Sequence, residues 1–234
     1  MLDVPDPEQD HDHCPLCGGR IHPLYPEPLV GGPYFHCDRC DLISTGEGGH
    51  LGPSEERTRY LEHDNSPDNV GYVSMFEEFL EKAVLPFSCG GRALEFGCGP
   101  GPVLAGLLEK HGFITDLYDP YFFPDEGHLC SGYDLVTSTE VFEHLSQPAE
   151  VLTRLCRMIR DDGILAVMTH LHPGRDDFIT WWYHRDPTHI TFYSAATLSW
   201  ICSQWPLDLL YSDDFKMATF RRTASRADDR TLPV

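Results

Sequence analysis

The sequence lacks any long apolar run. No stretch of its 234 residues approaches the roughly 20 consecutive apolar residues that a transmembrane helix needs, so no membrane association is expected. The first residues, Met-Leu-Asp-Val-Pro-Asp-Pro, are acidic and contain two prolines. A secretory signal peptide has a basic start followed by an apolar segment, which is the opposite pattern. We therefore expect a cytoplasmic protein.

Positive charge is also scarce. The chain has 17 lysine and arginine residues against 37 aspartate and glutamate residues, which gives a formal net charge of −20. Phosphate backbones and anionic lipid headgroups repel a surface of this sign. Broad nucleic-acid binding is therefore not expected, and a small-molecule substrate is favoured.

Four of the nine cysteines form two Cys-x-x-Cys pairs near the N-terminus: Cys14 with Cys17, and Cys37 with Cys40. Each pair can turn two thiolates toward one point, and two pairs complete a tetrahedral zinc site. Four thiolates leave no open position for chemistry, so the zinc is expected to be structural, with iron as the competing metal. The spacing predicts a zinc ribbon, which either recognises a substrate or partner or only stabilises the fold.

The chain after residue 67 alternates between strand-like and helix-like segments. This order predicts an α/β fold with a doubly wound, mostly parallel sheet whose last strand is antiparallel. We expect a zinc ribbon at 1–50, a linker at 51–66, the α/β domain at 67–222 and a loose tail at 223–234. The expected helices cover 71–85, 103–111, 149–160 and 195–205, and the expected strands 92–96, 113–118, 133–139, 164–169, 207–211 and 215–220.

A glycine-rich loop joins the first of these strands to the following helix. It reads Glu95-Phe-Gly97-Cys-Gly99-Pro-Gly101, and glycines at this position let the backbone approach a ligand closely. A dinucleotide-binding loop would need a third small residue at position 102, which is proline. The loop therefore disfavours a nicotinamide oxidoreductase.

The loop resembles the first motif of class I S-adenosylmethionine-dependent methyltransferases. Segments 133–145 and 163–168 resemble the fourth motif and the strand after it, and the motifs follow the family's order. The resemblance implies a Rossmann-like domain that binds S-adenosylmethionine, with Asp119 on the ribose hydroxyls; Asp119 could instead only form a turn with Pro120. The cofactor residues it implies are Glu95, Gly97, Gly99, Gly101, Asp119 and Thr139.

A second metal site is a further hypothesis. Glu140, Glu143 and His144 have the spacing that places three side chains on one face of a helical turn, and two carboxylates with an imidazole suit a divalent ion. The segment is similar to one in small-RNA 2′-O-methyltransferases and ubiquinone-pathway O-methyltransferases, where a later histidine, here His189, completes the set. Without metal, His144 or His189 could act as a general base. The expected catalytic residues are His144, His189 and Glu143.

Aromatic residues cluster in the segment 170–193. Trp181 and Trp182 are expected to face the substrate pocket, and Tyr183, Phe192 and Tyr193 either line it or belong to the core. The sequence thus predicts methyl transfer from S-adenosylmethionine to an unidentified acceptor, with oxygen favoured as the accepting atom. The alternative is a non-catalytic binding protein that keeps the methyltransferase fold.

Overall fold

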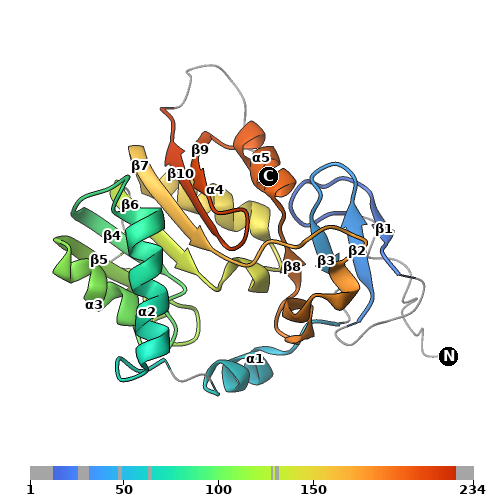
Figure 1. The fold of residues 1–234 in the computed structure, drawn as a ribbon, viewed down its shortest axis with the longest axis horizontal. Coiled ribbons are helices and arrows are strands. Elements are labelled where there is room, and N and C mark those ends of the chain that lie inside the picture. Colours follow the sequence, from blue (N-terminus) through green and yellow to red (C-terminus); the bar gives the residue numbers. More distant parts are fainter. Residues whose placement is uncertain are drawn as a thin grey trace.

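The computed structural model describes residues 13–25, 32–46, 49–62, 65–127, 129 and 132–224. Two sheets organise this part of the chain: a six-stranded sheet in the order β5-β4-β6-β7-β10-β9, and a four-stranded sheet in the order β1-β2-β3-β8 (Figure 1). None of the helices described is both long and apolar enough to cross a membrane.

The large sheet confirms the predicted fold class. Its strands β5, β4, β6 and β7 run parallel, and β10 then pairs antiparallel with both β7 and β9. The strands β9 and β10 form the hairpin that ends the domain. The strands are β4 (Gly91–Phe96), β5 (Phe113–Tyr118), β6 (Tyr133–Thr139), β7 (Ile159–Met168), β9 (Leu207–Ser212) and β10 (Met217–Arg222).

Helices cover both faces of this sheet, and each face has its own core. Alternate residues of a strand point to opposite faces, so Leu94 packs in one cluster and Ala93 in the other. Helices α2 and α3 pack on the Ala93 face, and α4 and α5 on the Leu94 face (Figure 1). The helices are α2 (Val70–Phe79), which continues as one π-helical turn (Leu80–Val84), α3 (Val103–Lys110), α4 (Pro148–Met158) and α5 (Ala195–Gln204).

The small sheet joins the N-terminal residues to the large domain. Strands β1 (Ile21–Pro23), β2 (Tyr34–Cys37) and β3 (Ile43–Thr45) are antiparallel neighbours, and β3 also pairs with β8 (Thr191–Phe192) from the far end of the chain. Leu16 and Leu42 belong to the same apolar cluster as Leu94. The N-terminal residues therefore share a core with the α/β domain.

The expected linker contains helix α1 (Pro53–Tyr60). Pro53 begins the helix, and the Glu55 carboxylate accepts from the Gly52 N–H at 3.1 Å. No residue of α1 is buried, so an apolar period could not have revealed it. In Figure 1 the helix lies between α2 and the segment that leads to β8.

Candidate functional site

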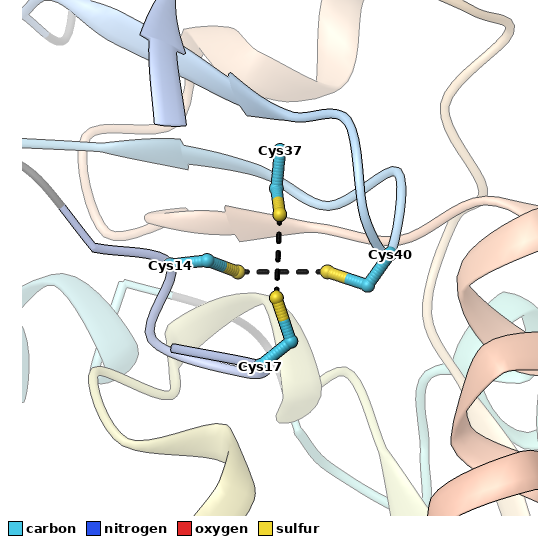
Figure 2. Close-up of side chains that lie close together, drawn as sticks. All are labelled: Cys14, Cys17, Cys37 and Cys40. Carbon is cyan, nitrogen blue, oxygen red and sulfur yellow. Dashed lines mark hydrogen bonds between the residues drawn. The ribbon is translucent and has the colours of Figure 1, made fainter. Parts of the chain in front are cut away.

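The four N-terminal cysteines converge. Their sulfur atoms all lie within 4.8 Å of one another, and Figure 2 shows each Sγ pointing to a common centre. The pairs Cys14–Cys40 and Cys17–Cys37 have sulfur–sulfur distances of 3.5 and 3.3 Å. All four are free thiols rather than disulfides.

Both Cys-x-x-Cys turns have the same backbone geometry. The residue after each pair, Gly18 or Asp41, has a positive φ of 64° or 61°. Its N–H donates to the carbonyl of the first cysteine, Cys14 at 2.9 Å or Cys37 at 2.8 Å. Glycine adopts this conformation freely and aspartate is among the residues that tolerate it, so the Asp41 turn was harder to see in the sequence.

The donor set fits zinc. Burial and the neighbouring Cys37 thiol raise the pKa of Cys17, so thiolates packed this closely need a cation to remain ionised. Four sulfur ligands on two matched turns are typical of structural zinc sites, with Zn–S distances of roughly 2.3 Å.

The glycine-rich loop lies between β4 and α3, as predicted. Gly97 has φ 80°, and a Cβ there would stand 2.3 Å from Val141 Cγ2. At Gly101 a Cβ would stand 2.1 Å from the Asn65 carbonyl oxygen. Both glycines are therefore required by close protein packing. Gly99, with φ 63° and no neighbour closer than 3.5 Å to the added Cβ, is the loop position that leaves room for a ligand.

Glu95 is the next-to-last residue of β4, just before this loop, and is only 3% exposed. Its Oε2 is buried without a hydrogen-bond partner among the described residues. Burial, reinforced by the charge of Asp119, raises the pKa of Glu95 to about 8. A buried carboxylate oxygen without a partner suits an ammonium group such as the one on the methionine part of S-adenosylmethionine.

Asp119 follows β5 and makes the turn that the sequence offered as an alternative. Its Oδ1 accepts from the N–H groups of Tyr121 at 2.8 Å and Phe122 at 3.1 Å. Its Oδ2 accepts from the Gly99 N–H at 3.0 Å and so ties the turn to the glycine-rich loop. Thr139, at the end of β6, is 8% exposed and lies at the same edge of the sheet.

Three of the four residues proposed for a second metal converge. One ligand atom from each of Glu143, His144 and His189 lies within 4.8 Å of the others. His144 Nδ1 bonds to the Thr188 carbonyl at 2.9 Å, and His189 Nδ1 to the Tyr183 carbonyl at 2.8 Å. A carbonyl only accepts, so each Nδ1 carries the proton and each Nε2 presents a lone pair.

Glu140 is not part of that group. The prediction that Glu140 shares one face of a helical turn with Glu143 and His144 is wrong. The only helix in this segment is a single 3-10 turn, Phe142–His144, and Glu140 precedes it with φ 53°. Helical spacing therefore does not apply to Glu140. Its carboxylate instead lies 3.1 Å from the Tyr183 hydroxyl, which also bonds to Glu143. No pattern in the sequence marks Tyr183 for this role.

Burial shapes the charges of this cluster. It raises the pKa of Glu140 to about 8 and lowers that of His189 to about 3. Glu143 is 0% exposed, and its Oε2 has no hydrogen-bond partner among the described residues. A buried carboxyl group that converges with two unprotonated imidazole nitrogens is a ligand set suited to a divalent ion.

The aromatic residues of the segment 170–193 differ in burial. Tyr183, Phe192 and Tyr193 are buried, and Trp181 packs on Phe192 and Tyr183 in a core cluster. Only Trp182 is exposed, at 58%. Its ring meets the imidazole of His170 at 5.2 Å, and the exposed Phe215 meets the same imidazole at 4.9 Å. Trp181 is only partly buried, so a pocket-facing position stays a prediction for both tryptophans.

Sequence comparison agrees with this architecture. Residues 69–211, more than half of the chain, match the family described as "Methyltransferase domain". The chain belongs to the class I, S-adenosylmethionine-dependent methyltransferase family. S-adenosylmethionine is the methyl donor of this family. No curated protein sequence matches the chain.

Two solved methyltransferase structures with TM-scores above 0.5 share the fold at low identity, and a third is similar at a lower score. The mitomycin 7-O-methyltransferase MmcR is 14% identical with a TM-score of 0.56, over 73% of this chain and 59% of its own. A chain in the complex of the Haloferax volcanii Trm112 methyltransferase activator with a methyltransferase is 13% identical with a TM-score of 0.52, over 75% of this chain and 97% of its own. The N-methyltransferase NodS from Bradyrhizobium japonicum, solved with S-adenosylhomocysteine, is 17% identical with a TM-score of 0.47, over 72% of this chain and 97% of its own.

Proposed function

We propose that this methyltransferase transfers a methyl group from S-adenosylmethionine to an oxygen of a small, flat acceptor, beside a divalent ion held by Glu143, His144 and His189. The observation that carries the proposal is the cluster itself. Two imidazoles keep Nε2 free because Nδ1 is bonded to a backbone carbonyl, and a carboxylate oxygen of the fully buried Glu143 converges with them.

The chemistry required of the protein is modest. S-adenosylmethionine supplies an already activated methyl group, so the protein has to position the acceptor and promote loss of its proton. A divalent ion at the cluster would lower the pKa of an acceptor hydroxyl. Glu95 would hold the ammonium group of the methyl donor, and Gly99 would leave space for the rest of its methionine part. Tyr183 holds Glu140 and Glu143 together through one hydroxyl.

A metal-free mechanism is the second candidate, favoured by the protonation of the histidines. Burial lowers the pKa values of His144 and His189, so both rings are neutral near pH 7 and either Nε2 could accept the acceptor's proton. The two candidates differ in their response to chelators, since only the first depends on an added ion.

The exposed aromatic side chains and the net charge of the protein support a small, flat acceptor. The exposed rings of Trp182 and Phe215 both contact the His170 imidazole, which also contacts the Tyr183 ring, and they offer apolar faces for a planar molecule. The net charge of −20 disfavours a nucleic-acid acceptor. We also propose that the four cysteines hold one zinc ion with no open position for substrate.

The test begins with cofactor binding and then surveys acceptors. Calorimetry should show S-adenosylhomocysteine binding, and a panel of planar phenols with S-adenosylmethionine and Mn²⁺ should yield an O-methyl product detected by mass spectrometry. Trp182→Ala should weaken acceptor binding while leaving the cofactor Kd within about twofold of its original value. Methylation of amines alone would reject the oxygen acceptor, and failure to bind the cofactor would support the non-catalytic alternative.

A further inference from the structure

The orientation of His144 depends on a chain of contacts that begins outside the cluster. The first link is the Thr188 carbonyl, which accepts from His144 Nδ1–H at 2.9 Å. If this carbonyl moved away, His144 would lose the hydrogen bond that favours the tautomer with a proton on Nδ1 and a free Nε2.

Asp186 holds Thr188 in place with one carboxylate oxygen. Its Oδ1 accepts from the Thr188 N–H at 3.0 Å and from the Thr188 hydroxyl at 2.7 Å. Two bonds to one residue fix the local backbone and therefore the direction of the Thr188 carbonyl. The other carboxylate oxygen, Oδ2, makes none of these bonds.

Arg59 of α1 binds that other oxygen. Its Nε and Nη2 donate to Asp186 Oδ2 at 3.2 and 2.8 Å. Burial disfavours the charge on Asp186, but the bonds from Arg59 and Thr188 outweigh it and hold the pKa of this carboxyl well below its usual range. Asp186 is thus ionised and anchored on both sides.

Helix α1 has few other anchors. None of its residues is buried, and the Tyr121 hydroxyl reaches back to Glu56. Tyr60 lies edge-on to the His144 ring with centroids 5.2 Å apart. An ion pair at one end and a ring contact on the histidine itself place α1 where it can control that imidazole.

We infer that Arg59 is a positioning residue: through Asp186 and Thr188 it holds His144 in the Nδ1-protonated tautomer, so that Nε2 faces Glu143 and His189. The tautomer is a property of the protein alone. Only the use of Nε2 as an ion ligand rests on the proposed function.

The test is long-range ¹H–¹⁵N NMR of the imidazoles in the zinc-loaded protein, with His144 assigned through a His144→Ala variant. The original protein should show His144 with Nδ1 protonated and Nε2 unprotonated. Arg59→Ala and Asp186→Ala should each shift its ¹⁵N signals toward a mixture of tautomers, and Arg59→Lys should restore the pattern in part.

Two controls separate positioning from general damage. Glu62→Gln removes the exposed second partner of Arg59, which lies 2.6 Å from its Nη1, and should leave His144 unchanged. His189, whose Nδ1 bonds to Tyr183 instead, should keep its tautomer in every variant. Unchanged His144 signals in Arg59→Ala and Asp186→Ala, or equal shifts in Glu62→Gln, would overturn the inference.

A parallel titration with Mn²⁺ keeps the two claims distinct. If the original protein binds Mn²⁺ at the cluster, Arg59→Ala should weaken that binding by up to roughly tenfold, because outer partners of ligating histidines tune affinity on this scale. If the original protein binds no Mn²⁺, the ion proposal fails while the tautomer result still decides the role of Arg59. Should one alanine variant not fold, the other and Arg59→Lys still give the readout.

Discussion

The backbone N–H of Ile190 donates to the carbonyl oxygen of Glu143 at 2.7 Å. The Ile190 carbonyl in turn accepts from the Thr45 N–H at 2.9 Å. One residue thus joins β3, which follows the cysteine turns, to the short turn that carries Glu143 and His144. Asp41 makes a second connection, because its carbonyl accepts from His172 Nε2 at 2.9 Å and its carboxylate accepts from the Ser194 hydroxyl at 2.5 Å.

This connection predicts that zinc loss damages the acceptor side of the site more than the cofactor side. Cys14→Ser should remove zinc and loosen β3 and β8, so hydrogen exchange should rise in residues 186–193. The Mn²⁺ affinity should fall by roughly tenfold or more, since ligand positions depend on the surrounding shell. The cofactor loop is held by β4 and α3 instead, so the Kd for S-adenosylhomocysteine should change by less than about threefold.

Cys89→Ser is the matched control, because Cys89 is exposed and lies outside the cysteine cluster. It should change neither zinc content nor exchange. Full loss of cofactor binding in Cys14→Ser, with exchange rising across the large sheet, would show that the two parts unfold together and would contradict the prediction.

Glu95 predicts a pH dependence of cofactor binding. Its pKa in the free protein is raised to about 8, so the carboxyl is neutral at lower pH and has no charge to offer an ammonium group. Binding of an ammonium favours the carboxylate, so affinity should rise with pH by up to about tenfold per unit below pH 8 and then level off. Calorimetry in buffers of different ionisation enthalpy should detect the released proton.

The same group has an opposite effect on the stability of the free protein. In the unfolded chain Glu95 ionises near the ordinary glutamate pKa of 4.5, whereas in the folded chain its pKa is raised to about 8. The unfolded state therefore binds fewer protons between these values, and the stability contributed by this group falls as pH rises through that window. Glu95→Gln should flatten both profiles. A steep cofactor profile in this variant would assign the dependence to a group other than Glu95.

The sequence predicted most of the large domain because its signals are local. Every predicted strand of the sheet is present, since short apolar runs and turn signals such as the loop after Phe96 define strands without tertiary information. The spacing of the cysteine pairs likewise predicted their convergence. One helix boundary was wrong: the helix predicted to end at residue 160 ends at Met158, and β7 begins at the next residue, Ile159. Ile159 is buried in the core, and the strand then accommodates Asp162 with φ 63°.

Features that depend on distant contacts were missed. Helix α1 carries no apolar stripe and is recognisable only through partners such as Asp186, far along the chain. The position of Glu140 depends on a left-handed backbone, and the helical spacing gave no sign of it. Tyr183 acts through one hydroxyl that bridges two carboxylates, and no sequence pattern marks a residue with that role.

Two glycines near the cofactor loop should respond in opposite ways to a methyl group. Gly101→Ala places a Cβ 2.1 Å from the Asn65 carbonyl oxygen, a backbone atom that cannot move alone. Gly106, inside α3, has nothing within 4 Å of the added atom. We expect Gly101→Ala to lower the free energy of unfolding by about 1–3 kcal/mol. We expect Gly106→Ala to raise it by about 0.5–1 kcal/mol, because alanine loses less backbone entropy in a helix.

Urea unfolding of both variants, followed by circular dichroism, measures the difference. Since Asn65 precedes α2 and faces the loop, Gly101→Ala should also weaken S-adenosylhomocysteine binding, whereas Gly106→Ala should not. Equal stability of Gly101→Ala and the original protein would mean that residues 65–69 can move away from the loop. The prediction that these residues hold a fixed position beside the loop would then be wrong.

The ion cluster gives the last prediction, which separates two metals in one chain. Mild chelation should remove a divalent ion from Glu143, His144 and His189 but leave the zinc, which four soft thiolates hold far more tightly. Protein treated in this way should bind about one Mn²⁺ per chain. His189→Ala removes one of three ligands and should weaken that binding by more than tenfold, while the cofactor Kd stays within about twofold.

His111→Ala is the control, because His111 is exposed at the end of α3 and lies outside the cluster. It should leave Mn²⁺ binding intact. The metal-free alternative predicts a different set of results: no Mn²⁺ binding, methyl transfer indifferent to chelator, and a pH profile governed by one imidazole. Binding of Mn²⁺ that survives His189→Ala would place the ion elsewhere and reject this cluster as its site, even if methyl transfer required metal.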